Sequence, residues 1–407
     1  MGSQIEKMAK TIDVHDPSAC KNATLWDSMT LEQFMRKHIW TQAAHDAVCA
    51  AGRCIFGVEP KHCSLLYYLT YMRSAGGLNA VISTEPGVGG QELKIEGGAW
   101  RISHRLADRI GKKNIHLNTA ITRIHQTSSK VIVTTEGLDT YQCDRAIVAL
   151  PPHQAARIEF SPPLPVEKLQ VITRMPPGDI TKVIVTYKDA FWRDNGFNGE
   201  AVTYGGPSIV DSCTKGPLCI IFDAMSGYDN PALVSFIGGQ QQVDYSKIEP
   251  SLRQKAVLHS LSQFFGEGVH EFLDYCEVNW NEEPFNGGGP VSVATPGVMK
   301  NMNVGLRLPV GRLHFAGSES ATVWPGFMNG AVQSGCRAAN EVLFNLRPQV
   351  VSARDMEDTA YDARRETETK MRQRRMPRFR IFRWTLGLGV LCAAIVVAQK
   401  AFFHKEM

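Results

Sequence analysis

The chain has 407 residues, enough to bury a large core, and this length predicts two domains. Its 44 Lys and Arg residues against 40 Asp and Glu residues give a net charge of only +4, which excludes a nucleic-acid partner for the body of the protein. Ten cysteines without regular spacing predict reduced thiols, so we assign neither a disulfide framework nor a metal site.

The first hundred residues have a helical pattern. A capping box at 30–33 opens a helix whose apolar positions continue to Ile39. A glycine-rich turn at 87–90 leads to a second short helix, which Gly111 ends. The apolar residues of this second helix share one face: Ile102, Leu106 and Ile110.

Between Asn114 and Leu150 the pattern changes to that of strands. Apolar and polar residues alternate over 115–121, and 131–133 is a second apolar run after a polar turn. Residues 146–150 predict a short buried strand that ends at Pro151.

The region that follows mixes strands and helices. Strands are predicted at 182–187, 218–223 and 312–315, and a helix near 252–265. A further helix begins near Phe327. Its apolar and small residues recur at spacings of four and three, which predicts one buried face: Met328, Val332, Gly335, Ala339, Val342 and Leu346.

The end of the chain predicts a membrane anchor. Residues 384–398 carry no charge, and the run reaches the ~20 residues of a span if Lys400 extends toward the far headgroups. Basic residues are concentrated in the segment before this run, as expected of the cytosolic flank of a membrane span. We therefore predict a charged linker over 348–383 and a single-pass tail anchor over 384–403, in the mitochondrial outer membrane with the body on the cytosolic side. A buried C-terminal helix is the alternative.

The segment 314–332 has the pattern of a ligand-binding strand, turn and helix. Glycines in the turn let the backbone approach a flat ligand closely. The start of the helix presents free N–H groups and the positive end of the helix dipole to an electron-rich group. By itself the pattern fits a cofactor or anion site and an ordinary strand–turn–helix equally well.

This segment resembles the C-terminal flavin motif of the flavin amine oxidases and is most similar to that of the monoamine oxidases. The resemblance extends from about Leu25 to Leu346. Its other matching segments occur in the family's order: Gly89–Glu92 with Gly97–Gly98, Ala149–Pro152, Phe160–Pro165 and Tyr187–Arg193.

The resemblance implies an α/β, two-domain FAD-linked amine oxidase fold. Residues 1–150 would hold helices and the remainder of the FAD-binding domain, 151–300 mainly the substrate domain, and 301–347 a flavin-binding strand–turn–helix. The implied reaction is oxidation of a neutral primary or secondary amine by flavin, hydrolysis of the imine to an aldehyde, and reduction of O2 to H2O2. The implied partners are a small amine, O2, the lipid bilayer and a second copy in a homodimer.

The resemblance also implies roles for single residues. Lys182 matches the family's lysine that holds a water against flavin N5, and a surface lysine on an edge strand is the alternative. Glu319 matches the acidic residue beside the cofactor's ribose and phosphates. The candidate cofactor contacts are Gly317, Glu319, Gly326, Phe327, Met328 and Ile121, and the candidate substrate contacts are Ile82, Gln91 and Phe327.

Three features depart from the family. Gly289 stands where the monoamine oxidases link the flavin to a cysteine, so FAD is expected to bind noncovalently. Pro290 and Phe327 stand where the family has two tyrosines, so one aromatic wall remains and standard aromatic monoamines are disfavoured. No Gly-x-Gly-x-x-Gly follows a strand, so we expect the fold to lack its N-terminal Rossmann βαβ unit and to expose sheet edges and apolar surface.

Three functions follow from these observations. The first is an FAD-dependent amine oxidase in a shortened form. The second is a catalytically inactive, truncated and membrane-anchored relative that acts by interaction. The third is polyamine or histone-lysine oxidation with noncovalent flavin, which Gly289 favours and the membrane tail disfavours.

Overall fold

The N-terminal part of the chain folds into helices, as predicted. The computed structural model describes residues 2–83, 87, 89–225 and 230–362. In the capping box of α3, Gln33 N donates to Thr30 Oγ1 at 3.1 Å and Thr30 N donates to Gln33 Oε1 at 2.9 Å, which confirms the predicted helix start. The helices of this region are α1 (Gly2–Ala9), α2 (Ala23–Asp27), α3 (Leu31–His38), α4 (Gln42–Phe56), α5 (Leu65–Ser74) and α6 (Leu78–Ile82).

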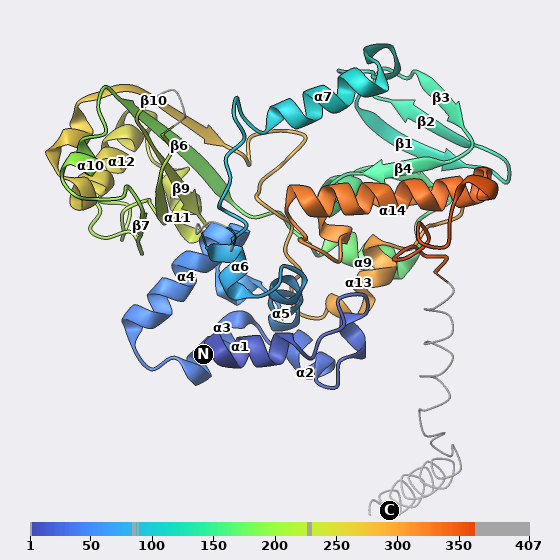
Figure 1. The fold of residues 1–407 in the computed structure, drawn as a ribbon, viewed down its shortest axis with the longest axis horizontal. Coiled ribbons are helices and arrows are strands. Elements are labelled where there is room, and N and C mark those ends of the chain that lie inside the picture. The colour runs from blue at the N-terminus through green and yellow to red at the C-terminus, as the bar shows by residue number, and fades with distance from the viewer. Residues whose placement is uncertain (1, 84–86, 88, 226–229, 363–407) are drawn as a thin grey trace, which may run out of the picture. The chain divides into compact units, whose positions relative to one another are not determined.

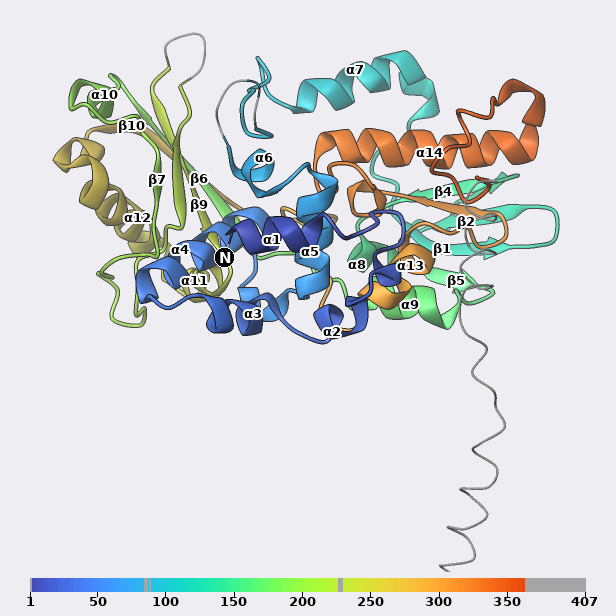
Figure 2. The same ribbon diagram turned by 60° about the horizontal axis from the view of Figure 1, so that its bottom comes forward.

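The second predicted helix is α7 (Trp100–Ile110), and the apolar face predicted for it is exposed. No residue of α7 is buried, and Leu106 and Ile110 on its apolar face are 50% and 56% exposed. In both views α7 lies above α14 (Met328–Leu346) (Figures 1 and 2).

A four-stranded sheet follows, in the order β3-β2-β1-β5. The prediction of a strand over 115–120 is wrong, because a 3-10 turn at Lys112–Asn114 and a left-handed backbone at Asn118 (φ +53°) interrupt the extended chain. Strand β5 pairs parallel with β1, while β2 pairs antiparallel with both β1 and β3. The strands are β1 (Ile121–Gln126), β2 (Val131–Thr135), β3 (Thr140–Cys143) and β5 (Glu159–Ser161).

Strands β4 (Ala146–Ala149) and β11 (Leu313–Ala316) pair in parallel with each other. They form a two-stranded sheet, and within the described ranges their outer edges have no strand partner. The predicted burial of β4 is therefore only partly correct, since Val148 is buried but Ile147 is 42% exposed. Chain segments more than 160 residues apart thus meet at the turn that follows β11.

The middle of the chain forms a five-stranded antiparallel sheet in the order β10-β6-β9-β8-β7. Side chains alternate along its strands, so that Val183 and Val185 pack into a core with α11 (Gln240–Tyr245) and α12 (Pro250–Phe265), while Ile180 faces the other way. The strands are β6 (Ile180–Tyr187), β7 (Ala201–Val202), β8 (Ile220–Asp223), β9 (Ala232–Gly238) and β10 (Phe272–Asn279), and the remaining short helices are α8 (Pro152–Ala155), α9 (Val166–Thr173), α10 (Phe191–Asp194) and α13 (Met302–Leu306).

The long helix α14 starts where the sequence predicts, but it buries the opposite face. Ser334, Arg337 and Glu341 are buried, whereas Val332 on the predicted inner face is 60% exposed. The reason is that the polar face of α14 packs onto β11 and the turn after it, where its side chains bond the backbone. The residues of the predicted inner face are half-buried or exposed: Met328, Val332, Gly335, Ala339, Val342 and Leu346.

Residues Met1–Ala360 form one compact unit. The predicted linker over 348–383 therefore begins inside this unit, since Thr359 is fully buried. The rest of that linker from 363 onward, and the predicted anchor over 384–403, lie outside the described residues. Within the described part of the chain, no helix combines the length and the apolar character needed to cross a membrane.

Candidate active site

The largest apolar cavity has a volume of about 400 Å³. It lies between the outer face of the five-stranded sheet, the helices α4 to α6 and the start of α14. Such a volume accommodates a small organic ligand. The lining residues are Ala51, Cys54, Ile55, Tyr71, Val81, Ile82, Gln91, Ile180, Val202, Ile220, Phe222, Phe236, Pro290, Val291, Gly326 and Phe327.

The predicted substrate contacts meet in this cavity. Ile82, Gln91 and Phe327 all line it, although Phe327 is far along the chain from the other two. Pro290, which replaces an aromatic residue of the family pattern, lines the same cavity. Gln91 Nε2 lies 3.5 Å from the Val81 carbonyl oxygen, so the amide is fixed at the wall. None of the described lining residues carries a carboxylate.

Aromatic rings support the wall beside α14. The ring centroid of Phe327 lies 6.2 Å from that of Tyr71 and 5.0 Å from that of Trp324. The residue before it, Gly326, has a φ of +78°, and a Cβ there would lie 3.0 Å from the Tyr71 hydroxyl oxygen. A side chain at Gly326 would therefore strain the backbone and displace the aromatic wall. Sequence reasoning missed Tyr71, for which the only signal was the aromatic run in α5.

A second cavity of about 310 Å³ adjoins the first. Pro290 and Val291 line both cavities, and Ala331 in the first turn of α14 lines only the second. Two predicted cofactor contacts, Gly317 and Glu319, also line the second cavity. The start of α14 therefore stands between the two cavities, with the positive end of its dipole toward them.

The turn after β11 is fixed by hydrogen bonds. Gly317 has a φ of +134°, and its N–H donates to Ser334 Oγ at 3.1 Å. Glu319 Oε1 accepts from Ser292 N at 3.2 Å, and Glu319 Oε2 accepts from Ser318 Oγ at 2.9 Å. The carboxylate is thus held at the cavity rim between the turn and the segment that follows Pro290.

Lys182 lies on the face of the five-stranded sheet that contributes to the large cavity. It is on β6, which has strand neighbours on both sides, so the alternative of an edge-strand lysine is wrong. Its Nζ is 5.8 Å from the ring centroid of Phe236, a residue of the cavity wall. Lys182 is paired with Phe236 in the register of β6 and β9, and it is half-buried.

Two predicted cofactor contacts line neither cavity. Met328, the first residue of α14, is 53% exposed. Ile121, the first residue of β1, packs against the core of the helical part. Both stay sequence-based predictions.

The residues present fit the flavin end of FAD. Gly288, Gly289 and Gly317 line the second cavity and add no side-chain bulk there, as a flat ring system requires. Gly289 offers no sulfur for a covalent link. Since the two cavities share a wall, a ring in the second would lie beside a ligand in the first.

A cluster that sequence reasoning did not identify lies between α3 and α4. His45 Nε2 is 3.1 Å from Glu32 Oε2, and Cys49 Sγ is 3.6 Å from His45 Nδ1. Burial, followed by the charge of Glu32, raises the pKa of the Cys49 thiol to about 12. Glu32 also bonds Arg36 at 2.8 Å, so we interpret the cluster as a hydrogen-bonded connection between two helices.

Comparison with known proteins gives consistent results. The family model for flavin containing amine oxidoreductases matches residues 13–343. The chain is 31% identical to the probable flavin-containing monoamine oxidase A of Dictyostelium discoideum, over 84% of this chain and 72% of that protein. It is 32% identical to the flavin-containing amine oxidase A of Bos taurus, over 86% of this chain and 65% of that protein. It is 33% identical to amine oxidase B of Canis lupus familiaris, of which it spans 64%.

Solved structures share the fold. Cyclohexylamine oxidase from Brevibacterium oxydans IH-35A superposes with a TM-score of 0.77 at 27% identity, over 85% of this chain and 74% of that chain. Wild-type putrescine oxidase bound to putrescine superposes with a TM-score of 0.76 at 23% identity, over 84% and 74%, and supports the fold alone. The α/β fold class expected from the sequence is therefore confirmed.

Proposed function

Because this chain belongs to the family of flavin-containing amine oxidoreductases, we propose that it oxidises a small primary or secondary amine. For a primary amine, the reaction consumes the amine, dioxygen and water and yields ammonia, hydrogen peroxide and a carbonyl product. This product is an aldehyde, or a ketone where the α-carbon carries two carbon substituents, as in cyclohexylamine. One observation carries the proposal. Ile82, Gln91, Pro290 and Phe327 stand at positions of the family's substrate pocket and line a single cavity.

FAD, when bound, would supply the oxidation by accepting a hydride equivalent from the amine's α-carbon and passing electrons to dioxygen. We propose that it binds noncovalently, since Gly289 stands in the place of the linking cysteine. The turn residues Gly317 and Glu319 and the helix start at Phe327 border the two cavities and would hold it. Gly326, Met328 and Ile121 complete the proposed contacts.

The chain's own residues would prepare the amine. Apolar walls disfavour the ammonium form, because desolvation lowers the pKa of an amine and so increases its neutral fraction. Phe327 would limit the orientation of the substrate on one side, and Pro290 leaves more room on the other. We propose that Lys182, on the cavity-facing side of the sheet, holds a water beside the reacting atoms.

The cavity favours apolar monoamines over diamines. None of the described lining residues offers a carboxylate for a second ammonium group, and burying an unpaired charge is costly. The similarity to cyclohexylamine oxidase agrees with a bulky aliphatic amine. We therefore place cyclohexylamine ahead of benzylamine, and both ahead of putrescine.

Purification of the full chain with FAD tests this function. We expect flavin absorbance after gel filtration, peroxide release with cyclohexylamine, and loss of the colour from the pellet after acid precipitation. Lys182→Met should slow turnover about tenfold, the effect of one lost hydrogen bond to the reacting site. Lys188→Met is the matched control, because Lys188 is exposed at the end of the same strand and should be silent. A protein that folds with saturating FAD yet binds none would refute the assignment.

An inactive relative that acts by interaction is the second candidate. The exposed apolar faces of α7 and α14 favour it, since large apolar patches mark interaction surfaces. The same preparation discriminates the two functions, because this candidate requires a folded protein without flavin or peroxide release.

We also propose that the segment 384–403 anchors the chain in a membrane, on the basis of its apolar sequence and the basic residues before it. The oxidase activity should then sediment with mitochondrial membranes in a fractionated lysate and require detergent for release. Activity that stays in the supernatant would contradict the anchor and leave the oxidase assignment intact.

A further inference from the structure

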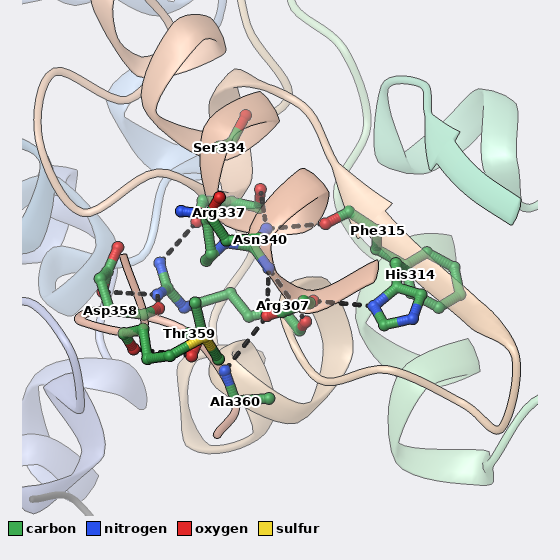
Figure 3. A network of polar contacts seen from close by, with 12 residues as sticks. Arg307, His314, Phe315, Ser334, Arg337, Asn340, Asp358, Thr359 and Ala360 are labelled. Atoms are coloured by element: carbon green, nitrogen blue, oxygen red, sulfur yellow. Dashed lines mark hydrogen bonds and ion pairs between the residues drawn. The ribbon is translucent and has the colours of Figure 1, made fainter. Parts of the chain in front are cut away.

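After α14, the chain returns to the turn 317–320 that follows β11, called the cofactor turn below. Residues 352–360, called the strap below, follow the helix and pack against its polar face (Figure 3). Thr359 in the strap is fully buried, and the side chain of Asp358 is 17% exposed. The sequence predicted a charged linker here and none of these contacts.

Asp358 is the centre of the strap's contacts. Its Oδ1 accepts from Arg307 Nη2 at 2.6 Å and lies 2.7 Å from His15 Nδ1. Its Oδ2 accepts from Thr322 Oγ1 at 3.2 Å and from Gln333 Nε2 at 3.1 Å. One carboxylate therefore connects the N-terminal region, the segment before β11, the segment before α14 and α14 itself.

Two buried arginines connect this network with the cofactor turn through hydrogen bonds. Arg307 Nη1 donates to the Ser320 carbonyl oxygen at 2.8 Å. Arg337 Nη2 donates to the Phe315 carbonyl oxygen at 2.7 Å and to Ser320 Oγ at 3.1 Å. Ser320 Oγ in turn donates to the Gly317 carbonyl oxygen at 2.8 Å. Arg307 and Arg337 thus form hydrogen bonds with both ends of the turn that borders the second cavity.

A second strap contact reaches the same network through Glu341, which is fully buried. Its Oε1 accepts from Arg337 Nη1 and from Ala360 N, each at 3.1 Å, and its Oε2 lies 3.0 Å from His314 Nδ1. Buried charge-assisted hydrogen bonds of this kind are stronger than neutral ones and fix geometry. Through Ala360 N, the strap therefore takes part in the hydrogen-bond network around Arg337.

From these contacts we propose that Asp358 is a positioning residue for the cofactor turn 317–320, acting through Arg307. The inference rests on the proposed function, because it treats that turn as part of the flavin site. Without the Asp358 carboxylate, Arg307 would lose its charged partner and keep only the Asp358 carbonyl oxygen, which lies 2.7 Å from its Nη2. Its bond to the Ser320 carbonyl would then be held less firmly. The turn would then sample more conformations, and FAD would bind more weakly.

The test compares two Asp→Asn substitutions in the same strap of the full chain. Asp358→Asn removes the charge and keeps a residue type that tolerates the φ of +66° found there. Asp355→Asn is the matched control, because the exposed Asp355 carboxylate bonds only Ser352 among the described contacts. FAD affinity and amide hydrogen exchange of the peptides that contain 317–322 are measured for both.

We expect Asp358→Asn to raise the Kd for FAD about tenfold, the factor for one lost charge-assisted contact, and to speed exchange at 317–322. The control should change neither quantity. Arg307→Lys, a second variant that keeps the charge but loses the forked geometry, should act in the same direction. Because both variants remove one contact, their effects in the double variant should be less than additive.

Other outcomes are equally informative. Unchanged exchange at 317–322 in Asp358→Asn would overturn the inference, as would a uniform increase over the whole chain, which indicates a purely structural role. If the parent chain binds no FAD, the proposed function fails. The exchange measurement on the flavin-free protein then still decides whether Asp358 positions the turn.

Discussion

Lys168 is a charged residue placed in the core beneath the cofactor turn. It is 1% exposed, its Nζ donates to the Gly305 carbonyl oxygen at 2.8 Å, and it lies 3.8 Å from the ring centroid of Phe315. Burial, and then the charge of Arg337, lowers the pKa of Lys168 to about 7. Near neutral pH this amine therefore loses its proton in the folded state while it keeps it in the unfolded state.

This shift predicts a pH dependence of stability. Between the folded pKa of about 7 and the ordinary value of 10.5, the unfolded state binds more protons, so the free energy of unfolding rises with pH. The contribution is about 1.4 kcal/mol per pH unit and is absent in Lys168→Met. The measurement is urea denaturation of both proteins from about pH 7 to about pH 9, within the range between the two pKa values. Lys188→Met should keep the parent's slope, and a parallel profile for Lys168→Met would contradict the shift.

At the residue scale, the sequence predicted residues that line the cavity, but it did not predict the buried cations Lys168 and Arg337. Ile82, Gln91 and Phe327 were transferred from the resemblance, and the fold brings them together because the matching segments keep the family's order. Lys168 and Arg337 could not be identified in this way. Residue type alone does not show whether a lysine or arginine is buried or exposed. Only the tertiary contacts of its head group distinguish the two cases.

At the element scale, α14 shows what a periodic pattern leaves open. The spacing of apolar residues predicted the helix and its start, because both depend on local sequence. It predicted the wrong face, because Ser334 and Arg337 bond the backbone of β11 and of the turn that follows it, and Glu341 bonds the His314 side chain of β11. These partners lie outside the helix, so the pattern of the helix alone contains no signal for them.

The buried polar face of α14 predicts a strong and pH-dependent role for Glu341. Although burial favours the neutral acid, the His314 hydrogen bond and the charge of Arg337 hold the pKa of Glu341 below its ordinary value of 4.5. This depressed pKa stabilises the fold above 4.5, and the contribution is lost as the pH falls through the folded pKa.

Glu341→Gln should therefore destabilise the fold by about 3 kcal/mol at neutral pH, since it leaves Arg337 without its charge partner. The deficit should shrink in acid below 4.5, where the parent carboxylate is protonated too. Urea denaturation at neutral pH and below pH 4.5 measures the two free energies of unfolding. Glu267→Gln serves as the control, because that side chain is 92% exposed and should be neutral at either pH. An equal deficit at both pH values would contradict the charged state of Glu341.

At the scale of the whole molecule, the large apolar cavity depends on how two cores meet. One core gathers the helices α1 to α5 with β1, β4 and β11, and the other fills the space between the five-stranded sheet and α12 (Figure 1). The cavity wall draws on residues from Ala51 to Phe327. The sequence predicted the α/β class, but the pairing of β4 with β11 and the meeting of the cores depend on long-range contacts that no local pattern encodes.

The same molecule exposes apolar surface where it does not meet a described neighbour. Leu106 on α7 and Val332 on α14 are 50% and 60% exposed, and α7 lies above α14 in both views (Figures 1 and 2). If these faces are open in solution, polar residues there cost little. The double variant Leu106→Gln/Val332→Gln should then change the free energy of unfolding by less than about 0.5 kcal/mol. It should also bind less of a fluorescent dye that reports exposed apolar surface.

A buried leucine gives the comparison. Leu261 in α12 is fully buried, and Leu261→Gln should destabilise the fold by more than about 3 kcal/mol, because it loses packing and buries an amide. If the double variant of α7 and α14 were destabilised by a similar amount, with no loss of dye binding, the two faces would be covered in solution. Their apolar residues would then belong to a core or interface that forms when a further segment or a second copy packs on them.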